Sequence, residues 1–430
     1  MMETDKRNYS APTWHLLPIP LVVRVMRDLP IRAALRVGLT CRNWWPAFWE
    51  PSLWRRVEFD FQRGLAQDSG QQGCIGQFGH HIRSVVIRLN QAELDNRVLA
   101  TDTLRKLAAI PQRQIRRLRI QFTGENPLFY RGQQLLICTT PLFIDALSYF
   151  GQYPLNNQSH RLISLDLSEL SVALTDQLLL SFTQHLGTLE ELNIQNKQLI
   201  CQVSAATMEQ LMTEAPRIRD LRLSHSCLND GVLLALCNNR QVRLEHLSIM
   251  CSRQQKYNKS EDLSESVWRR LLSVHPALNV TLKFDHTCPL WRVREILKPG
   301  IPLVNLFLET FTELTAELES VGHMYGHTLR KLVVQTHASQ ELDAALVDVA
   351  RCCKQLQSLH VMCVVTKETA DAILALHPQM TRNPNNYTLK HRLELCPWLS
   401  DALMDELRNT GAIKMLQSKS SSSTSDAKHD

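Results

Sequence analysis

The chain has 430 residues, 44% of them hydrophobic and 21% charged, which is a composition typical of globular proteins with enough apolar material for a core. Its 48 basic and 42 acidic residues leave a net charge of +6, which is too mild to indicate nucleic-acid binding without a clustered basic patch. The N-terminus lacks the apolar stretch of a secretory signal, and Arg24 interrupts the first candidate for a membrane span. We therefore expect an intracellular protein, cytoplasmic or nuclear, whose twelve cysteines are free thiols.

A dense N-terminal module at residues 14–58 is expected to follow a loose polar start at residues 1–13. Pro18 and Pro20 suit the first turn of a helix, where a missing backbone N–H costs little. Apolar residues then recur at helical spacing until Pro30 ends the helix. A second helix is predicted over residues 31–39, and a third after Cys41, carrying Trp44. Such a small apolar unit is hard to stabilise alone. Its apolar face is therefore expected either to contact a partner protein or to pack on the rest of the chain.

Residues 59–80 hold five of the 15 glycines and are predicted to form a linker or loop. From residue 81 to 416 we predict a repeat array, degenerate over 81–161 and regular over 162–365. A helical cap is expected at 366–416 and a disordered serine-rich tail at 417–430. The regular repeats share an L-x-x-L-x-L pattern that starts at Leu162, Leu189, Ile218, Leu244, Ala277, Leu303, Leu329 and Leu356.

These starting positions step by 27, 29, 26, 33, 26, 26 and 27 residues. Leucine-rich repeats span about 20–29 residues, so only one step exceeds their range. In each copy alternate residues face opposite sides of a short strand, and a helical stretch follows. The pattern predicts an α/β fold in which the N-terminal module precedes a curved solenoid, with parallel strands inside and helices outside. An ordinary α/β domain with leucine-rich strands is the alternative.

The N-terminal module resembles an F-box, the motif that binds the Skp1 adaptor of cullin-based ubiquitin ligases. The matching features are Leu17-Pro18, the apolar helix after it, the Cys41-Arg42-Asn43-Trp44 motif and the closing Leu53-Trp54-Arg55. The sequence departs from the family's pattern at Pro20, Met26 and Thr40, and these departures leave the apolar face in place. An F-box followed by leucine-rich repeats is itself a known family arrangement. Two short stretches, at 244–250 and 296–303, resemble segments of one family member.

The resemblance implies a non-catalytic subunit without a cofactor, which binds Skp1 and through it a cullin–RING scaffold, while the repeats hold a protein substrate for ubiquitination and degradation. The Skp1-binding residues that it implies are Leu17, Pro18, Leu21, Val22, Val25, Met26, Leu29, Leu35, Cys41, Trp44, Leu53 and Trp54. Because tryptophans are frequent interface hot spots, Trp54→Ala is expected to weaken Skp1 binding and leave the repeats folded. A repeat scaffold or inhibitor-like binder that acts without Skp1 is the competing hypothesis.

The substrate is expected to lie on the sheet face, formed by side chains between the leucines of each repeat. The candidates are Arg117, Arg119, Asp166, Glu191, Asn193, Asp220, Arg222, His246, Phe307, Lys331 and His360. This mixed-charge set favours a polar protein surface or peptide. The cluster at residues 116–119 would place Arg117 and Arg119 on one face, where arginine forks match phosphate, although a solvated strand explains the cluster as well.

The motifs of common enzyme classes are absent from the sequence. It contains no phosphate-binding G-x-x-x-x-G-K-[ST], no H-E-x-x-H, no G-x-S-x-G and no C-x-x-C. The adjacent pairs Cys352-Cys353 and His80-His81 are poorly spaced for a tetrahedral metal site. A ligase that carries ubiquitin on a catalytic cysteine would need an activated thiol, for which Cys396 is the candidate to test. We expect neither a metal site nor a membrane partner, and the charge does not favour nucleic acid.

Overall fold

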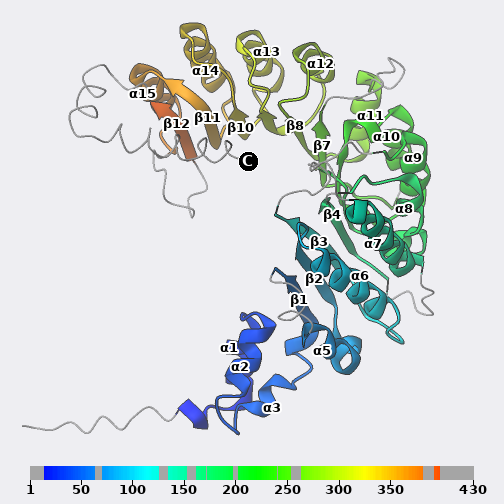
Figure 1. The fold of residues 1–430 in the computed structure, drawn as a ribbon. Helices are drawn as coiled ribbons and strands as arrows, with labels where there is room; N and C mark the ends of the chain where they lie inside the picture. Colours follow the sequence, from blue (N-terminus) through cyan, green and yellow to red (C-terminus); the bar gives the residue numbers. More distant parts are fainter. Residues whose placement is uncertain are drawn as a thin grey trace, which may run out of the picture. The chain divides into compact units, whose positions relative to one another are not determined.

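The computed structural model describes residues 14–62, 70–124, 134–152, 161–170, 172–196, 202–239, 241–252, 263–380 and 392–397. The chain divides into two compact units, of which the first is Met1–Leu247 with Lys256–Leu278 and the second is Ser248–Gln255 with Asn279–Asp430. In both units parallel strands follow one another in chain order, with helices between them (Figure 1). This confirms the predicted α/β class and the leucine-rich repeat solenoid.

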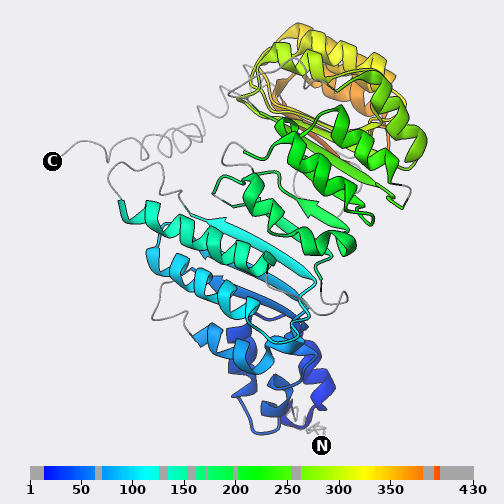
Figure 2. The same cartoon turned by 90° about the vertical axis from the view of Figure 1, so that its right-hand side faces the viewer.

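The first unit begins with the N-terminal module, which consists of η1 (Trp14–Leu16), α1 (Ile19–Arg27), α2 (Ile31–Gly38), α3 (Trp45–Phe48) and η2 (Leu53–Arg55). Its first strands and helices are β1 (Arg56–Phe61), α5 (Gly70–Phe78), η3 (Gly79–His81), β2 (Ser84–Asn90), α6 (Leu94–Ala108), β3 (Arg117–Thr123) and α7 (Gln134–Gln152). Helices α6 and α7 lie side by side over the same face of these strands (Figures 1 and 2).

The first unit continues with β4 (Ser164–Glu169), α8 (Asp176–Leu180), η6 (Thr183–Thr188), β5 (Glu191–Asn193), α9 (Ala205–Thr213), β6 (Asp220–Ser224), η7 (His225–Cys227), α10 (Asp230–Asn238) and α11 (Glu265–Val274). The division between the units runs through β7 (His246–Cys251). The second unit contains β8 (Asn279–Phe284), α12 (Leu290–Ile296), β9 (Leu303–Leu308), α13 (Thr315–Tyr325), β10 (Lys331–Val334), α14 (Gln340–Cys352), β11 (Ser358–Val365), α15 (Lys367–Leu376) and β12 (Arg392–Pro397).

The repeated leucines form the core of the array. Leu162, Leu165 and Leu167 of the first regular repeat are buried, and so are the equivalent residues of the later copies except Ala277, which is exposed while the next residue, Leu278, is buried. Strand β2 alternates between buried and half-buried residues along its whole length, so one face of this strand is buried and the other stays partly accessible. Because one repeat cannot bury its own apolar face, stacking of neighbours supplies the core.

Side-chain caps start the helices and also link successive repeats. Ser204 begins α9, and its hydroxyl accepts a hydrogen bond from the amide of Thr207 at 3.2 Å. The backbone N–H of the same Ser204 donates to the carboxylate of Asp176 in the preceding helix at 2.7 Å. The same link recurs from Ser264 to Asp230 at 2.8 Å and, in the second unit, from Thr366 to Asp343 at 3.1 Å.

The segment predicted to be a linker at 59–80 contributes regular structure. Residues 56–61 form β1, which pairs in parallel with β2, so the strand layer begins before residue 81. The glycine-rich stretch forms helix α5, which buries Ile75 and Phe78. Glycine disfavours a helix by about 1 kcal/mol relative to alanine, and here the burial of these apolar side chains outweighs that penalty.

The predicted helical cap at 366–416 is correct at its start and wrong further on. Helix α15 covers Lys367–Leu376, but residues 392–397 form strand β12, which extends the parallel layer beside β11. The expected loose N-terminus at 1–13 and the tail at 417–430 lie outside the described residues.

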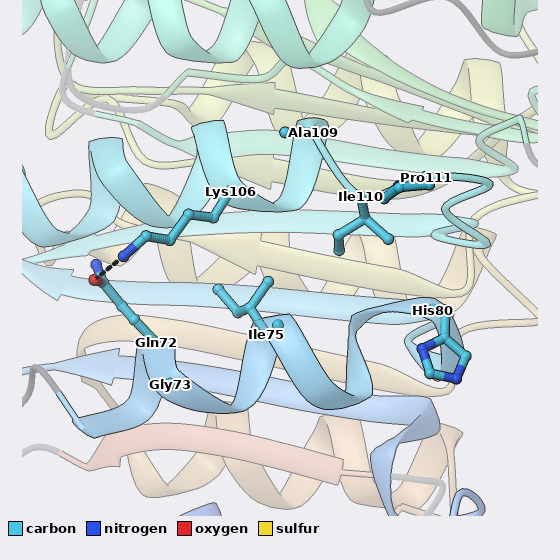
Figure 3. Close-up of a pocket in the computed structure, with 9 residues that line it drawn as sticks. Gln72, Gly73, Ile75, His80, Lys106, Ala109, Ile110 and Pro111 are labelled. Carbon is cyan, nitrogen blue, oxygen red and sulfur yellow. Dashed lines mark hydrogen bonds between the residues drawn. The ribbon is translucent and has the colours of Figure 1, made fainter.

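A cavity of about 660 Å³ separates α5 from the C-terminal end of α6. Figure 3 shows Ile75 and Ile110 in its walls, with His80 at one end and Lys106 at the other. The Lys106 ammonium donates to the amide oxygen of Gln72 at 2.9 Å and pairs with Asp102 at 2.7 Å.

We expect Gly73→Ala to stabilise the protein, because a Cβ at this position of α5 would meet no atom within 4 Å. Alanine costs less chain entropy in a helix, which should raise the free energy of unfolding by about 0.5–1 kcal/mol. Urea denaturation would measure the change. Gly79→Ala is the contrasting variant, because its Cβ would lie 2.6 Å from Ile110 Cδ1, and it should destabilise. Equal effects from both variants would contradict the packing of α5.

Candidate functional site

Three short helices build the N-terminal module around a small core. The residue before α1 is Pro18 and the residue before α2 is Pro30, so both helices begin as predicted. Helix α3 starts only at Trp45, so Trp44, which was expected within a helix starting after Cys41, precedes it instead. Gly38 permits a close approach of α2 to α3, since a Cβ there would lie 3.3 Å from that of Phe48. The buried side chains of these three helices are those of Val22, Val23, Met26, Ala34, Ala47 and Phe48.

Two hydrogen bonds fasten the first turn, η1, to the loop before α3. The indole N–H of Trp44 donates to the carbonyl oxygen of Trp14 at 3.1 Å. The side-chain amide of Asn43 donates to the carbonyl oxygen of His15 at 3.2 Å. Residues of the predicted Cys-Arg-x-Trp motif therefore position the start of the module.

Trp54 belongs to the core, contrary to the expectation that it contributes to an open face. Its side chain is only 2% exposed, and its indole N–H donates to the carbonyl oxygen of Phe48 at 2.8 Å. The ring stacks on Phe78, with the ring centroids 3.9 Å apart and the planes 4° from parallel. Because Phe78 belongs to α5, this contact fixes the N-terminal module against the segment that was expected to be a linker.

The N-terminal module carries a large apolar surface that the described residues of the first unit leave exposed. Leu21 and Val25, one turn apart on α1, are 47% and 59% exposed. Ten of the eighteen large apolar side chains that are exposed among the described residues fall within this short module. We call these ten the N-terminal apolar surface: Trp14, Leu16, Ile19, Leu21, Val25, Leu29, Leu35, Leu39, Trp45 and Trp49. A surface of this density is typical of interaction sites.

The twelve residues predicted to bind Skp1 divide between surface and core. Five are exposed, namely Pro18, Leu21, Val25, Leu29 and Leu35; four are half-buried, namely Leu17, Cys41, Trp44 and Leu53; and three are buried, namely Val22, Met26 and Trp54. Six exposed residues of the N-terminal apolar surface were not among the twelve: Trp14, Leu16, Ile19, Leu39, Trp45 and Trp49. The sequence did indicate that further apolar side chains would be exposed, because α1 and its flanks carry more apolar residues than one buried helix face can hold.

The sheet face of the first unit aligns the predicted polar residues in two rows. Parallel pairing places Arg117 beside Ser164 and Ser164 beside Glu191, and then Asp220. The second row consists of Arg119, Asp166, Asn193 and Arg222. Parallel pairing therefore brings these candidate side chains next to one another on the sheet face.

The arginines of this face pair with carboxylates of the same face. Arg119 lies 3.4 Å from Asp166 and 3.0 Å from Glu169. Arg117 reaches past the short Ser164 side chain to Glu191, at 3.6 Å. These ion pairs occupy the two arginines that were considered for phosphate recognition.

A cavity of about 200 Å³ lies among Asp166, Glu191, Asn193, Asp220 and Arg222. Arg222 donates two hydrogen bonds to Asp220, at 2.8 and 2.6 Å. The hydrogen bonding to Asp220 and the negative charges of Asp220, Asp166 and Glu191 raise the pKa of Arg222, although partial burial opposes this. The guanidinium therefore remains charged in its acidic surroundings.

The four remaining predicted residues of the sheet face lie on strands β7, β9, β10 and β11. His246 is exposed at the start of β7. In the second unit, Phe307 and His360 share a row in which Val333 lies between them. Lys331 lies in the neighbouring row, between Asn305 and Ser358.

Comparison with known proteins relates the greater part of the chain to one group. Human (Homo sapiens) F-box/LRR-repeat protein 8 is 27% identical over 382 residues, which cover 89% of this chain and 96% of the human protein. The mouse (Mus musculus) form is 27% identical over 384 residues, with the same coverage. The chain is similar to the F-box/LRR-repeat proteins. No family model matches the chain.

A more distant F-box/LRR-repeat relative supports the same grouping. F-box/LRR-repeat protein 21 of cattle (Bos taurus) is 23% identical over 356 residues, covering 80% of this chain and 76% of the bovine protein. The family member whose segments resemble residues 244–250 and 296–303 is F-box only protein 33, and this finer likeness stays a prediction. The F-box/LRR-repeat similarity covers 80–89% of this chain and agrees with the fold.

Two buried thiols of the second unit lie in surroundings that disfavour the reactive thiolate. Burial raises the pKa of Cys288 and of Cys353 to about 12, which disfavours the thiolate. Cys396 lies on β12, outside the residues whose side chains are described. Over those described side chains, no three His, Cys, Asp or Glu residues gather as metal ligands. Within the described helices, none has the length and apolar character needed to cross a bilayer.

Proposed function

We propose that this chain is the substrate-recognition subunit of a Skp1–cullin–F-box ubiquitin ligase. The N-terminal apolar surface carries the proposal, because it concentrates exposed leucines and tryptophans on a module that resembles an F-box. Large apolar and aromatic side chains of this kind dominate the centres of protein interfaces. The F-box/LRR-repeat relatives support the same role.

In this proposal the chain supplies positioning, and the chemistry of ubiquitin transfer takes place on other subunits. The N-terminal apolar surface docks on Skp1, which connects the chain to a cullin–RING scaffold. A protein substrate binds the sheet faces of the array. Tethering then makes the transfer of ubiquitin effectively intramolecular, which raises its rate without a catalytic group on this chain.

The proposal is tested by mixing the purified chain with Skp1 and then with a cullin–RING scaffold. We expect the three to elute together from a sizing column, and Skp1 to bind in calorimetry with a dissociation constant of about 1 μM or tighter, equivalent to about −8 kcal/mol. No binding of Skp1 to the folded chain would reject the ligase role and favour a repeat scaffold that acts without Skp1. Deleting residues 14–56 would be a poor substitute, because it would strip Trp54 from Phe78.

A further inference from the structure

The connection from β9 to α13 presents a large aromatic side chain to solvent. Phe311 is 49% exposed and has a φ of 55°, a backbone conformation that bulky residues rarely adopt. Glycine takes this conformation without strain, so the chain keeps an exposed ring here at a conformational cost. The ring of His286 meets it edge-on, with the ring centroids 6.5 Å apart. A ring kept in solvent at a strained position is a candidate for contact with another molecule.

Hydrogen bonds hold the backbone on both sides of Phe311. Its own amide donates to the carbonyl oxygen of Gln335, in the connection that follows β10, at 3.1 Å. The hydroxyl of Thr336, a buried residue, donates to the carbonyl oxygen of Thr312. The hydroxyls of Thr310 and Thr312 share a further hydrogen bond at 2.9 Å. The backbone that carries the ring is therefore ordered before any partner binds, which lowers the entropic cost of binding.

Carboxylates flank this ring in the sequence and in the sheet. Glu309 and Glu313 lie two residues before and two residues after Phe311, the first half-buried and the second exposed. Neither forms an ion pair with another residue that the structure describes. The amide of Glu309 donates to the carbonyl oxygen of Phe284 at 2.9 Å, which continues the ladder of β8 and β9. Asp285, the residue after Phe284, therefore lies beside Glu309.

Positive charge in the adjoining segment 283–294 is limited. Arg292 and Arg294 of α12 are each within 4 Å of a glutamate of α12 or α13. The ammonium of Lys283, one row earlier on the accessible face of the strands, lies 5.6 Å from the ring centroid of Phe307. Three carboxylates against this one ammonium leave the surroundings of the exposed ring acidic.

We propose that Phe311, with Glu309 and Glu313, forms a site for an arginine or lysine side chain within a basic segment of a protein substrate. A cation is attracted to the face of an aromatic ring, and the two carboxylates supply the complementary charge. Arginine suits the site best, because its planar guanidinium stacks on a ring while its N–H groups donate to carboxylates. This inference rests on the proposed function, since it names the substrate class of the array.

A random twelve-residue peptide library displayed on phage tests the inference with the full chain. We expect the selected peptides to be enriched in arginine and lysine. For a selected peptide, Phe311→Gly should bind about fivefold more weakly or worse in calorimetry, because the ring that faces the cation is lost. Glycine adopts a φ of 55° freely, so the urea midpoint of this variant should not fall. Binding of the peptide by Phe311→Gly at the wild-type affinity would overturn the inference.

The charge contribution is tested by Glu309→Gln/Glu313→Gln, which keeps the size of both side chains. It should weaken binding about fivefold or more and reduce the dependence of binding on salt concentration. The matched control is Glu93→Gln/Glu214→Gln, which removes two exposed carboxylates of the first unit and should bind like the wild type. Selected peptides without basic enrichment, or equal weakening by both double variants, would contradict the proposed site.

Skp1 binding by the same variants reports separately on the proposed function. We expect all of them to bind Skp1 like the wild type, because the three residues of the site lie far along the chain from the N-terminal module. A wild-type chain that does not bind Skp1 would reject the ligase role whatever the peptides show. A chain that binds Skp1 but selects no basic peptides would overturn this inference alone.

Discussion

Trp54→Ala is expected to lower the free energy of unfolding by about 3–5 kcal/mol, the range for removing a large aromatic side chain from a core. The indole is 2% exposed, hydrogen-bonded to Phe48 and stacked on Phe78. Its loss removes the stacked contact with Phe78 of α5, and it leaves the carbonyl oxygen of Phe48 without its donor. Urea denaturation followed by tryptophan fluorescence and circular dichroism would measure the change.

The control for this prediction is Trp14→Ala, which removes a tryptophan that is 60% exposed. Its carbonyl oxygen, which accepts from Trp44, is part of the backbone and stays in place. We expect this variant to change the unfolding free energy by less than about 1 kcal/mol, because little apolar area is lost from the core. If Trp54→Ala were as stable as Trp14→Ala, the stacked core would be wrong, and the original expectation of a surface role for Trp54 would return.

The double variant Leu21→Glu/Val25→Glu is expected to weaken Skp1 binding about 30-fold or more, equivalent to about 2 kcal/mol, the level of an interface hot spot. Both side chains lie on the exposed side of α1, while Val22 and Met26 fill its buried side. Glutamate is a good helix former, so α1 should persist while its exposed face becomes charged. Calorimetry with purified Skp1 measures the affinity, and circular dichroism verifies the fold.

A matched variant separates this effect from a general loss of apolar surface. Val98 on α6 and Leu142 on α7 are each 48% exposed, so Val98→Glu/Leu142→Glu makes the same chemical change on the array. It should bind Skp1 like the wild type. Should the two double variants bind Skp1 equally well, the N-terminal apolar surface would not be the docking site.

The repeat architecture could be read from the sequence because its signal is local and repeated. The L-x-x-L-x-L pattern specifies which strand residues are buried, and eight copies at nearly constant spacing imply stacking. The same pattern indicates which side chains lie on the opposite face of each strand, because residues alternate between the two faces along a strand. The starts of α1 and α2 were also predictable, because Pro18 and Pro30 favour a helix that begins directly after them, which is a local effect.

Features that depend on contacts distant in the chain were not predictable in this way. Strand β1 and helix α5 were missed because the glycines of the segment signal a loop, whereas Ile75 and Phe78 gain burial only against the folded unit. Strand β12 was missed because only its pairing with β11 reveals it. Local propensity cannot report stabilisation that arises from packing.

The sequence by itself determined the class of the fold, the repeat register and the likeness of the N-terminal module to an F-box. Only the tertiary structure decided which apolar residues of that module are surface and which are core. Leu21 and Trp54 are equally apolar in the sequence, yet Leu21 is 47% exposed and Trp54 is 2% exposed because Phe78 covers it. Likewise, only the three-dimensional arrangement shows that Arg119 is paired with Asp166 and Glu169, while Lys331 lies beside the ring of Phe307. The physical reason is that hydrophobicity and charge belong to single residues, whereas burial and pairing depend on neighbours that folding brings together.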